Sequence, residues 1–213
     1  MNNYIKINHA VKKYQENTVL NDINLEFESG NIYGIIGRNG SGKTVLLKSI
    51  CGLIHLTGGE IIVNDKIVGK DIDFPENIGI IIETPGFLSN YSGFKNLQML
   101  AGIKNKIQKN DIKESIKKVG LDPDSKKHVG KYSMGMKQRL GIAQAIMENP
   151  DILLLDEPMN GLDNQGVKEM RELFQKLKEE GKLMILCSHN PTDIEILCDH
   201  VYEIDRGIIK QLY

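Results

Sequence analysis

Residues 32–44 read I-Y-G-I-I-G-R-N-G-S-G-K-T. The run 32–36 is typical of a strand buried on both faces, and a glycine-rich turn joins it to a helix that we expect over 43–51. The turn matches G-x-x-x-x-G-K-[ST], in which glycines let backbone N–H groups face phosphate oxygens at the positive end of a helix. In this context the stretch predicts a binding site for the phosphates of a nucleotide. The alternative is a glycine-rich turn that holds no ligand. The predicted members of the site are Gly37, Arg38, Asn39, Gly40, Ser41, Gly42, Lys43, Thr44 and Val45.

Two carboxylates follow a second apolar run, I-L-L-L-D-E-P at 152–158. Ligands of open α/β sheets bind at the carboxyl ends of strands, so both side chains are expected beside the phosphate loop. There Thr44 and Asp156 would hold Mg²⁺, which prefers oxygen ligands, and Lys43 would reach the β- and γ-phosphates. Glu157 would accept the proton of an attacking water. The alternative is that the two carboxylates only cap a turn.

Two further residues have an ordinary structural interpretation beside a functional one. His189 ends the strand L-M-I-L-C and can sense a γ-phosphate, but a histidine at a strand end is as often structural. Tyr14 can stack on a purine, although an ordinary half-buried tyrosine is the commoner case.

The rest of the chain indicates strands at both ends and helices in the middle. Strands are expected at 4–7, 23–27, 78–82, 183–187 and 201–204, and a hairpin at 59–68 turning at Asn64 and Asp65. From Thr84 to Pro150 the spacing becomes helical, with Ile112, Ile116 and Val119 on one face. The pattern predicts a mainly parallel α/β core interrupted by a helical insertion. Lysines from 104 to 127 are expected on solvated helix faces rather than at a partner site.

Composition excludes several classes of protein. The chain has 213 residues, 40% of them apolar, and a net charge of −1, so it can form one packed domain but offers no basic field for nucleic acid. Three unclustered cysteines favour free thiols in a reducing compartment over disulfides. No signal peptide or run of about 18 apolar residues is evident, so a link to a membrane would need a partner.

Five motifs in order now carry a specific resemblance: G-R-N-G-S-G-K-T, Y-S-M-G-M-K-Q-R at 132–139, I-L-L-L-D-E-P, N-G-L-D at 160–163 and S-H at 188–189. Over essentially its whole length the chain resembles the ATP-binding subunit of an ABC transporter. The resemblance implies a P-loop NTPase with a RecA-like, mainly parallel core sheet, an antiparallel β-subdomain and an inserted α-helical lobe. The core is expected over about 1–83 and 150–213, and the helical subdomain over about 84–149, within a single ATP-binding domain.

The resemblance also assigns roles. Tyr14 resembles the adenine-stacking aromatic residue, Asp163 the residue that links two sites, and His189 the switch histidine. Ser133 and Gly135 occupy the signature motif, usually L-S-G-G-Q, which binds the γ-phosphate held by the opposite subunit. The family therefore implies two ATP molecules between two subunits in a head-to-tail dimer, expected to be a homodimer, and ATPase activity that drives a separate membrane permease.

Four positions differ from the usual family pattern. Met134 replaces a glycine and Met136 a glutamine of the signature motif, and Val45 replaces a second hydroxyl of the phosphate loop. Glu83 replaces the glutamine that senses Mg²⁺ and couples to the membrane subunit. A carboxylate at this position can still bind the cation that accompanies the nucleotide. Y-S-x-G-M-K-Q-R and E-x-P-G-F resemble the bacitracin and lantibiotic-immunity exporters, which implies export of a peptide antibiotic, bacteriocin or related hydrophobic compound.

The expected location is the cytoplasmic face of the cell membrane, through the permease. Aromatic residues between Phe87 and Phe94 either receive the membrane subunit or pack within the helical lobe.

Two other functions stay open: a soluble ABC ATPase that acts on ribosomes or DNA, and a module that senses ATP without turnover. The single cassette without a basic patch disfavours the first, and the presence of Glu157 and His189 disfavours the second.

Overall fold

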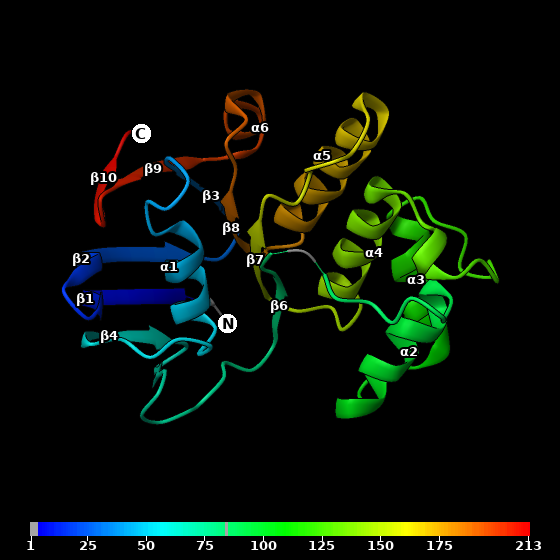
Figure 1. Ribbon diagram of the computed structural model, residues 1–213, viewed down its shortest axis with the longest axis horizontal. Coiled ribbons are helices and arrows are strands. Elements are labelled where there is room, and N and C mark those ends of the chain that lie inside the picture. Colours follow the sequence, from blue (N-terminus) through cyan, green and yellow to red (C-terminus); the bar gives the residue numbers. More distant parts are fainter. Residues whose placement is uncertain (1–3, 84) are drawn as a thin grey trace.

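The computed structural model describes residues 4–83 and 85–213. Strands alternate with helices except in the middle of the chain, where helices follow one another (Figure 1). In chain order the elements are β1 (Tyr4–Tyr14), β2 (Asn17–Glu28), β3 (Ile32–Ile36), α1 (Lys43–Ile50), β4 (Gly58–Val63), β5 (Lys66–Ile67), β6 (Ile78–Ile81), α2 (Gly93–Lys104), α3 (Lys109–Lys118), the 3-10 turn η1 (Val129–Lys131), α4 (Met134–Ile146), β7 (Ile152–Asp156), α5 (Asn164–Glu179), β8 (Leu183–Cys187), α6 (Pro191–Leu197), β9 (His200–Asp205) and β10 (Ile208–Gln211).

A six-stranded sheet forms the centre of the molecule, in the order β10-β9-β3-β8-β7-β6. All its strand pairs are parallel except β9 with β10. Side chains that alternate along β7 enter two different cores: Leu153 and Leu155 join one, Ile152 and Leu154 the other. Both faces are therefore covered, which explains why the strands read as unbroken apolar runs.

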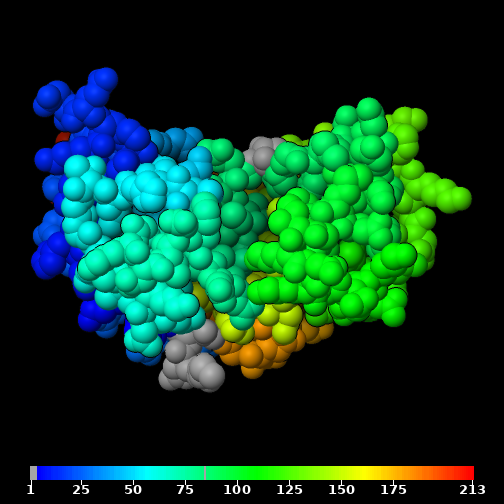
Figure 2. Space-filling model, turned by 90° about the horizontal axis from the view of Figure 1, so that it is seen from below, coloured from blue at the N-terminus to red at the C-terminus, as the bar shows by residue number. Residues whose placement is uncertain are grey.

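The two faces carry different layers (Figure 1). On one face, α1 lies between the central sheet and a second, antiparallel sheet of order β2-β1-β4-β5. On the other face lie α2, α3, α4 and α5. Seen from below, the cyan β4 region and the green α2 and α3 helices form two masses that meet at the middle of the molecule (Figure 2).

Helix α3 shows why the helical segment folds against the sheet. Ile112 and Ile116 are 2% exposed and Val119 is fully buried, whereas most neighbouring lysines face solvent. Several lysines of the stretch 104–127 pair with nearby carboxylates, such as Lys113 with Asp124 at 2.5 Å. The solvated-face interpretation of this stretch therefore matches the structure.

The predicted combination of a mainly parallel sheet, antiparallel strands and a helical insertion is confirmed. The hairpin turn also lies at Asn64 and Asp65, both with positive φ. The predicted first residue of the helical subdomain, Thr84, lies outside the described residues, and the domain boundaries stay a prediction. All three cysteines are free, and burial raises the pKa of Cys198 to about 12.

Candidate nucleotide-binding site

The phosphate loop connects β3 to α1 in a tight turn. Gly42 adopts φ 115° immediately before α1, and a Cβ on Gly37 would lie 2.3 Å from the Ile204 carbonyl oxygen, so neither position accepts a side chain without strain. Lys43 folds back over the loop and its Nζ donates to the Gly37 and Arg38 carbonyls at 2.5 and 3.1 Å. The loop thus holds a nearly buried ammonium group at a helix N-terminus.

Ser41 supplies an independent sign of a ligand. Its Oγ is buried and has no hydrogen-bond partner among the described residues. Buried hydroxyl groups in folded proteins are nearly always paired, and Ser41 lines the cavity beside the loop. An acceptor oxygen placed in the cavity would satisfy it.

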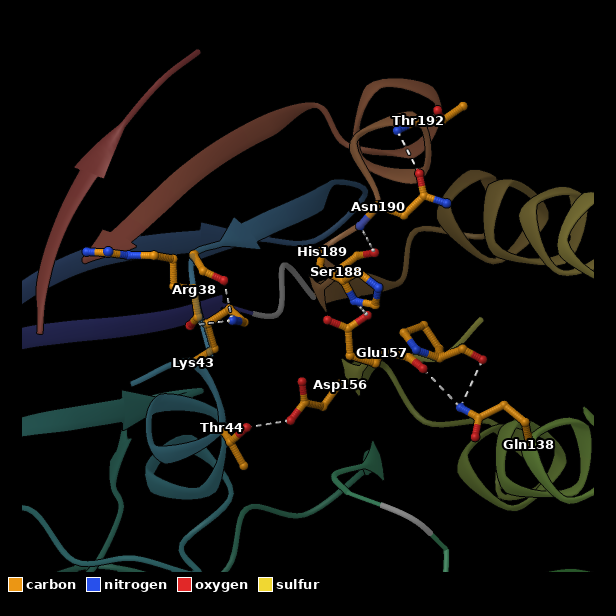
Figure 3. Close-up of polar contacts among 12 residues, drawn as sticks. Arg38, Lys43, Thr44, Gln138, Asp156, Glu157, Ser188, His189, Asn190 and Thr192 are labelled. Carbon is orange, nitrogen blue, oxygen red and sulfur yellow. Dashed lines mark hydrogen bonds and ion pairs between the residues drawn. The ribbon is translucent and has the colours of Figure 1, made fainter. Parts of the chain in front are cut away.

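A threonine and a carboxylate meet across the cavity. Thr44, at the start of α1, donates from Oγ1 to Oδ2 of Asp156, the last residue of β7, at 2.7 Å (Figure 3). Both are oxygen ligands of the kind that Mg²⁺ prefers, and they lie beside the lysine that would hold phosphate oxygens. The donor set therefore fits a magnesium–nucleotide ligand.

Glu157 and His189 form a second pair at the same edge of the sheet. Strands β7 and β8 are parallel neighbours, with Asp156 opposite Cys187, so the residues that follow both strands meet. His189 Nδ1 lies 2.8 Å from Glu157 Oε2 (Figure 3). The His189 side chain is 70% exposed and that of Glu157 28% exposed, so the histidine is the more accessible member of the pair.

Thr44, Asp156 and Glu157 border one cavity of about 800 Å³, whereas His189 lies outside its wall and contacts Glu157. Its size suits a small-molecule ligand, and most of the predicted phosphate-loop residues are in its wall. The lining residues are Val19, Asn39, Gly40, Ser41, Gly42, Lys43, Thr44, Val45, Glu83, Pro85, Met134, Lys137, Gln138, Asp156, Glu157 and Asn160.

Glu83 reaches this cavity but is already paired. Its Oε1 lies 2.5 Å from Nζ of Lys48, which is one turn further along α1 than Thr44. The Lys48 side chain is 25% exposed and that of Glu83 is 64% exposed. The ion pair offsets the negative charge that a glutamic acid adds beside a phosphate site.

The signature residues lie at the start of α4. Ser133 is the N-cap and its Oγ accepts from the Met136 N–H at 3.2 Å. Gly135 packs so closely that an added Cβ would lie 2.9 Å from the Gly161 carbonyl oxygen. Neither Ser133 nor Gly135 lines the cavity of its own chain, whereas Met134 does and also packs on Gly161.

Besides Ser133, three predicted side chains are absent from the cavity wall: those of Tyr14, Arg38 and His189. Tyr14 is 46% exposed at the end of β1, with the Lys12 ammonium 4.8 Å from its ring centroid. Arg38 turns away to pair with Asp205 at 2.8 Å, and only its backbone contacts Lys43. Their roles in nucleotide binding stay predictions.

Sequence reasoning assigned no role to Val19, Asn160 or Gln138, although all three line the cavity. Val19 comes from β2 and belongs to no motif, whereas Asn160 begins the motif N-G-L-D, in which only Asp163 was given a role. Gln138 lies in the stretch Y-S-M-G-M-K-Q-R, beyond the five residues that correspond to L-S-G-G-Q. Its amide contacts the chain next to Glu157 (Figure 3).

Among residues 4–83 and 85–213, no group of three or more histidine, cysteine, aspartate or glutamate side chains is arranged to hold a metal ion. Among the same residues, no helix has the length and apolar character required to cross a membrane.

Comparisons with known proteins agree with this geometry. The model of the family described as ABC transporter matches residues 20–160. An uncharacterised ABC transporter ATP-binding protein of Bacillus subtilis, YybJ, is 46% identical over 206 residues, which are 97% of this chain and 94% of that protein. The bacitracin transport ATP-binding protein BcrA of Bacillus licheniformis is 42% identical over 97% of this chain and 68% of its own length.

Solved structures share the fold. An ATP-binding cassette solved as a dimer in a post-hydrolysis state with ADP and Pi superposes with a TM-score of 0.87. It is 22% identical, and the match covers 98% of this chain and 99% of that one. Fold, motif order and relatives all lead to one conclusion: the chain belongs to the ABC transporter family, as one of its ATP-binding subunits, the ATPases whose hydrolysis is coupled to transport.

Proposed function

We propose that this chain binds ATP in the cavity beside its phosphate loop, with the phosphates on the loop N–H groups and Lys43. The observation that carries the proposal is the convergence of Lys43, the Thr44–Asp156 pair and Glu157, itself held by His189, on one cavity. The unpaired Ser41 hydroxyl supports it, because a phosphate oxygen would supply the missing partner.

Thr44 and Asp156 would hold Mg²⁺, and Glu83 would contribute once it leaves Lys48. When bound, the cation would neutralise charge on the phosphate oxygens. Lys43 has a separate proposed role. Its ammonium group would give up its hydrogen bonds to the Gly37 and Arg38 carbonyls and donate to phosphate oxygens instead.

Hydrolysis needs a base beside the γ-phosphate, and Glu157 is the proposed one. Its carboxylate would take a proton from the attacking water while the γ-phosphate passes to that water's oxygen and ADP leaves. His189 holds one carboxylate oxygen at 2.8 Å and would help to fix the orientation of the other.

A second copy of the chain would complete each site. Ser133 and Gly135 lie at a helix N-terminus, where backbone N–H groups attract anions, yet they are outside the cavity of their own chain. This arrangement supports a head-to-tail dimer in which each signature motif meets the γ-phosphate held by the partner. The dimeric cassette described above has the same fold.

The work of the cycle would drive an integral membrane permease, with this chain on the cytoplasmic face of the membrane. Leu88 and Tyr91, 53% and 45% exposed, offer apolar surface for a partner before α2, whereas Phe87 and Phe94 pack against the core. Relatives named for bacitracin transport and for lantibiotic transport support a peptide antibiotic or a related hydrophobic compound as the exported substrate.

The decisive experiment is Glu157→Gln, which keeps the size of the side chain and removes the base. We expect the rate of phosphate release to fall by about 10²–10⁴-fold, while ATP affinity stays close to wild type. Glu172→Gln, on an exposed face of α5, is the matched control and should hydrolyse ATP normally. Normal hydrolysis by Glu157→Gln would show that another group is the base.

A further inference from the structure

Helix α4 contacts the segment that carries Glu157 at several points. Met134 packs on Gly161, Gln138 reaches the chain at residues 157 and 158, and Arg139 pairs with Glu169 at 2.7 Å. The Gln138 contact is the one closest to the proposed base. Its Nε2 donates to the carbonyl oxygens of Glu157 and Pro158 at 3.1 and 3.0 Å (Figure 3).

The backbone of Glu157 needs such support. Its φ of 49° lies in the left-handed region, which is unfavourable for a residue with a side chain. The Glu157 N–H donates to the Cys187 carbonyl at 2.9 Å, and the Glu157 carbonyl also accepts from the Asn160 N–H at 3.1 Å. These two contacts come from β8 and from the turn itself, whereas Gln138 comes from the helical lobe.

We infer that Gln138 is a positioning residue for Glu157: its amide fixes the left-handed turn and so aims the carboxylate into the cavity. The inference rests on the proposed role of Glu157 as the base. Gln138 lines the same cavity, but its Nε2 is directed to two protein carbonyls. A positioning residue should therefore affect the rate of hydrolysis much more than the affinity for ATP.

The chemistry of the contact makes the amide specific. Both partners are carbonyl oxygens and can only accept, so the side chain must donate. A carboxylate at position 138 would face these oxygens with lone pairs, and this repulsion would displace the turn. In its protonated form the same group would regain one donor, and hydrogen bonding by the neutral form would raise its pKa.

The test compares Gln138→Glu with Gln144→Glu, the same chemical change six residues further along α4, where the side chain lies beside β6 instead of the cavity. We expect kcat for Gln138→Glu to fall by about 10- to 100-fold, as for a displaced catalytic group. The dissociation constant for ATP should change less than twofold. Gln144→Glu should match wild type in both measurements.

A pH series separates positioning from general damage to the fold. The ratio of kcat for Gln138→Glu to kcat for wild type should rise as the pH falls from about 8 to about 5.5, because protonation restores a donor. A merely structural defect would leave this ratio flat. If Gln138→Glu does not accumulate as folded protein, Gln138→Met removes the donor without a charge and should show the same loss of kcat.

Wild type and Glu157→Gln are measured in parallel. They distinguish a failure of the positioning role from a failure of the proposed function. If wild type hydrolyses ATP, Glu157→Gln does not, and both Gln138 variants turn over normally, the positioning role is wrong and the base stands. Equal losses of ATP affinity and kcat would also overturn it, because they would make Gln138 a binding residue. If wild type releases no phosphate, the proposed function itself has failed.

Discussion

At the scale of single residues, Glu83 departs from the family pattern, and its charge is paired within the chain. A carboxylate beside phosphates is repulsive, but Lys48 lies 2.5 Å away and offsets the charge. Because Glu83 also lines the cavity, a cation bound there would compete with Lys48 for its carboxylate. The departure at Glu83 therefore has its compensation on α1, three residues beyond Val45.

Met134 is the departure whose effect can be measured most directly. Its side chain is 61% exposed, borders the cavity and packs on Gly161, where the family usually has no side chain. In the Glu157→Gln background, Met134→Gly should strengthen ATP-driven dimerisation by about fivefold, because relief of crowding at a packed contact is worth about 1 kcal/mol. Analytical ultracentrifugation with ATP measures this.

The control for this comparison is Met134→Leu in the same background, which keeps the bulk and should behave like Glu157→Gln alone. Identical dimerisation constants for Glu157→Gln with and without Met134→Gly would mean that the methionine does not crowd the interface.

At the scale of elements, the buried strands and the phosphate loop were predictable because their patterns are local. β3, β7 and β8 appear as continuous apolar runs, and their ends carry the residues of the site. The first two strands are longer than predicted, Tyr4–Tyr14 and Asn17–Glu28, because bulges interrupt their alternation. His9 and Asp22, with φ 51° and 56°, lie at such irregular positions.

Contacts between distant elements could not be read from the chain. The side-chain direction of Arg38 depends on Asp205, which is 167 residues away, and β10 is an exposed edge strand with only a weak pattern. The link from Gln138 to Glu157 likewise appears only once α4 packs beside the end of β7. The motifs therefore predicted what kind of site the chain carries, whereas tertiary packing determines which side chains of each motif line the cavity.

Helices α5 and α6 are joined by a buried ion pair that makes a prediction about stability. Arg171 donates from two nitrogens to Oδ1 of Asp193, whose side chain is 4% exposed. Arg171→Met leaves this carboxylate buried without its cation and should lower the free energy of unfolding by about 3 kcal/mol. Urea denaturation measures the change.

The double variant Arg171→Met, Asp193→Leu should recover most of that loss, since a well-packed apolar pair often replaces a buried ion pair at little cost. Lys117→Met breaks an exposed pair with Glu114 and should leave the urea midpoint unchanged. A double variant as unstable as the single one would mean that Arg171 stabilises α5 by other contacts.

At the scale of the whole molecule, the phosphate loop and the signature motif begin helices in different layers of the fold. The loop precedes α1, which packs between the two sheets, and the signature motif begins α4 in the helical layer (Figure 1). Ser133 is exposed and absent from the cavity wall. A head-to-tail partner would bring the two motifs together while each chain keeps its own Lys43, Thr44 and Asp156.

This arrangement can be tested by mixing two inactive variants. Lys43→Ala removes the cation of the phosphate loop, and Ser133→Asp keeps a good N-cap for α4 while its carboxylate repels a γ-phosphate. In a head-to-tail dimer of one copy of each, both changes fall in the same composite site and the other site is intact. Phosphate release should therefore return to about a quarter of the wild-type rate, since half of randomly paired dimers are mixed and each has one complete site. If each chain used its own signature motif, every site in the mixture would be defective and no activity would return.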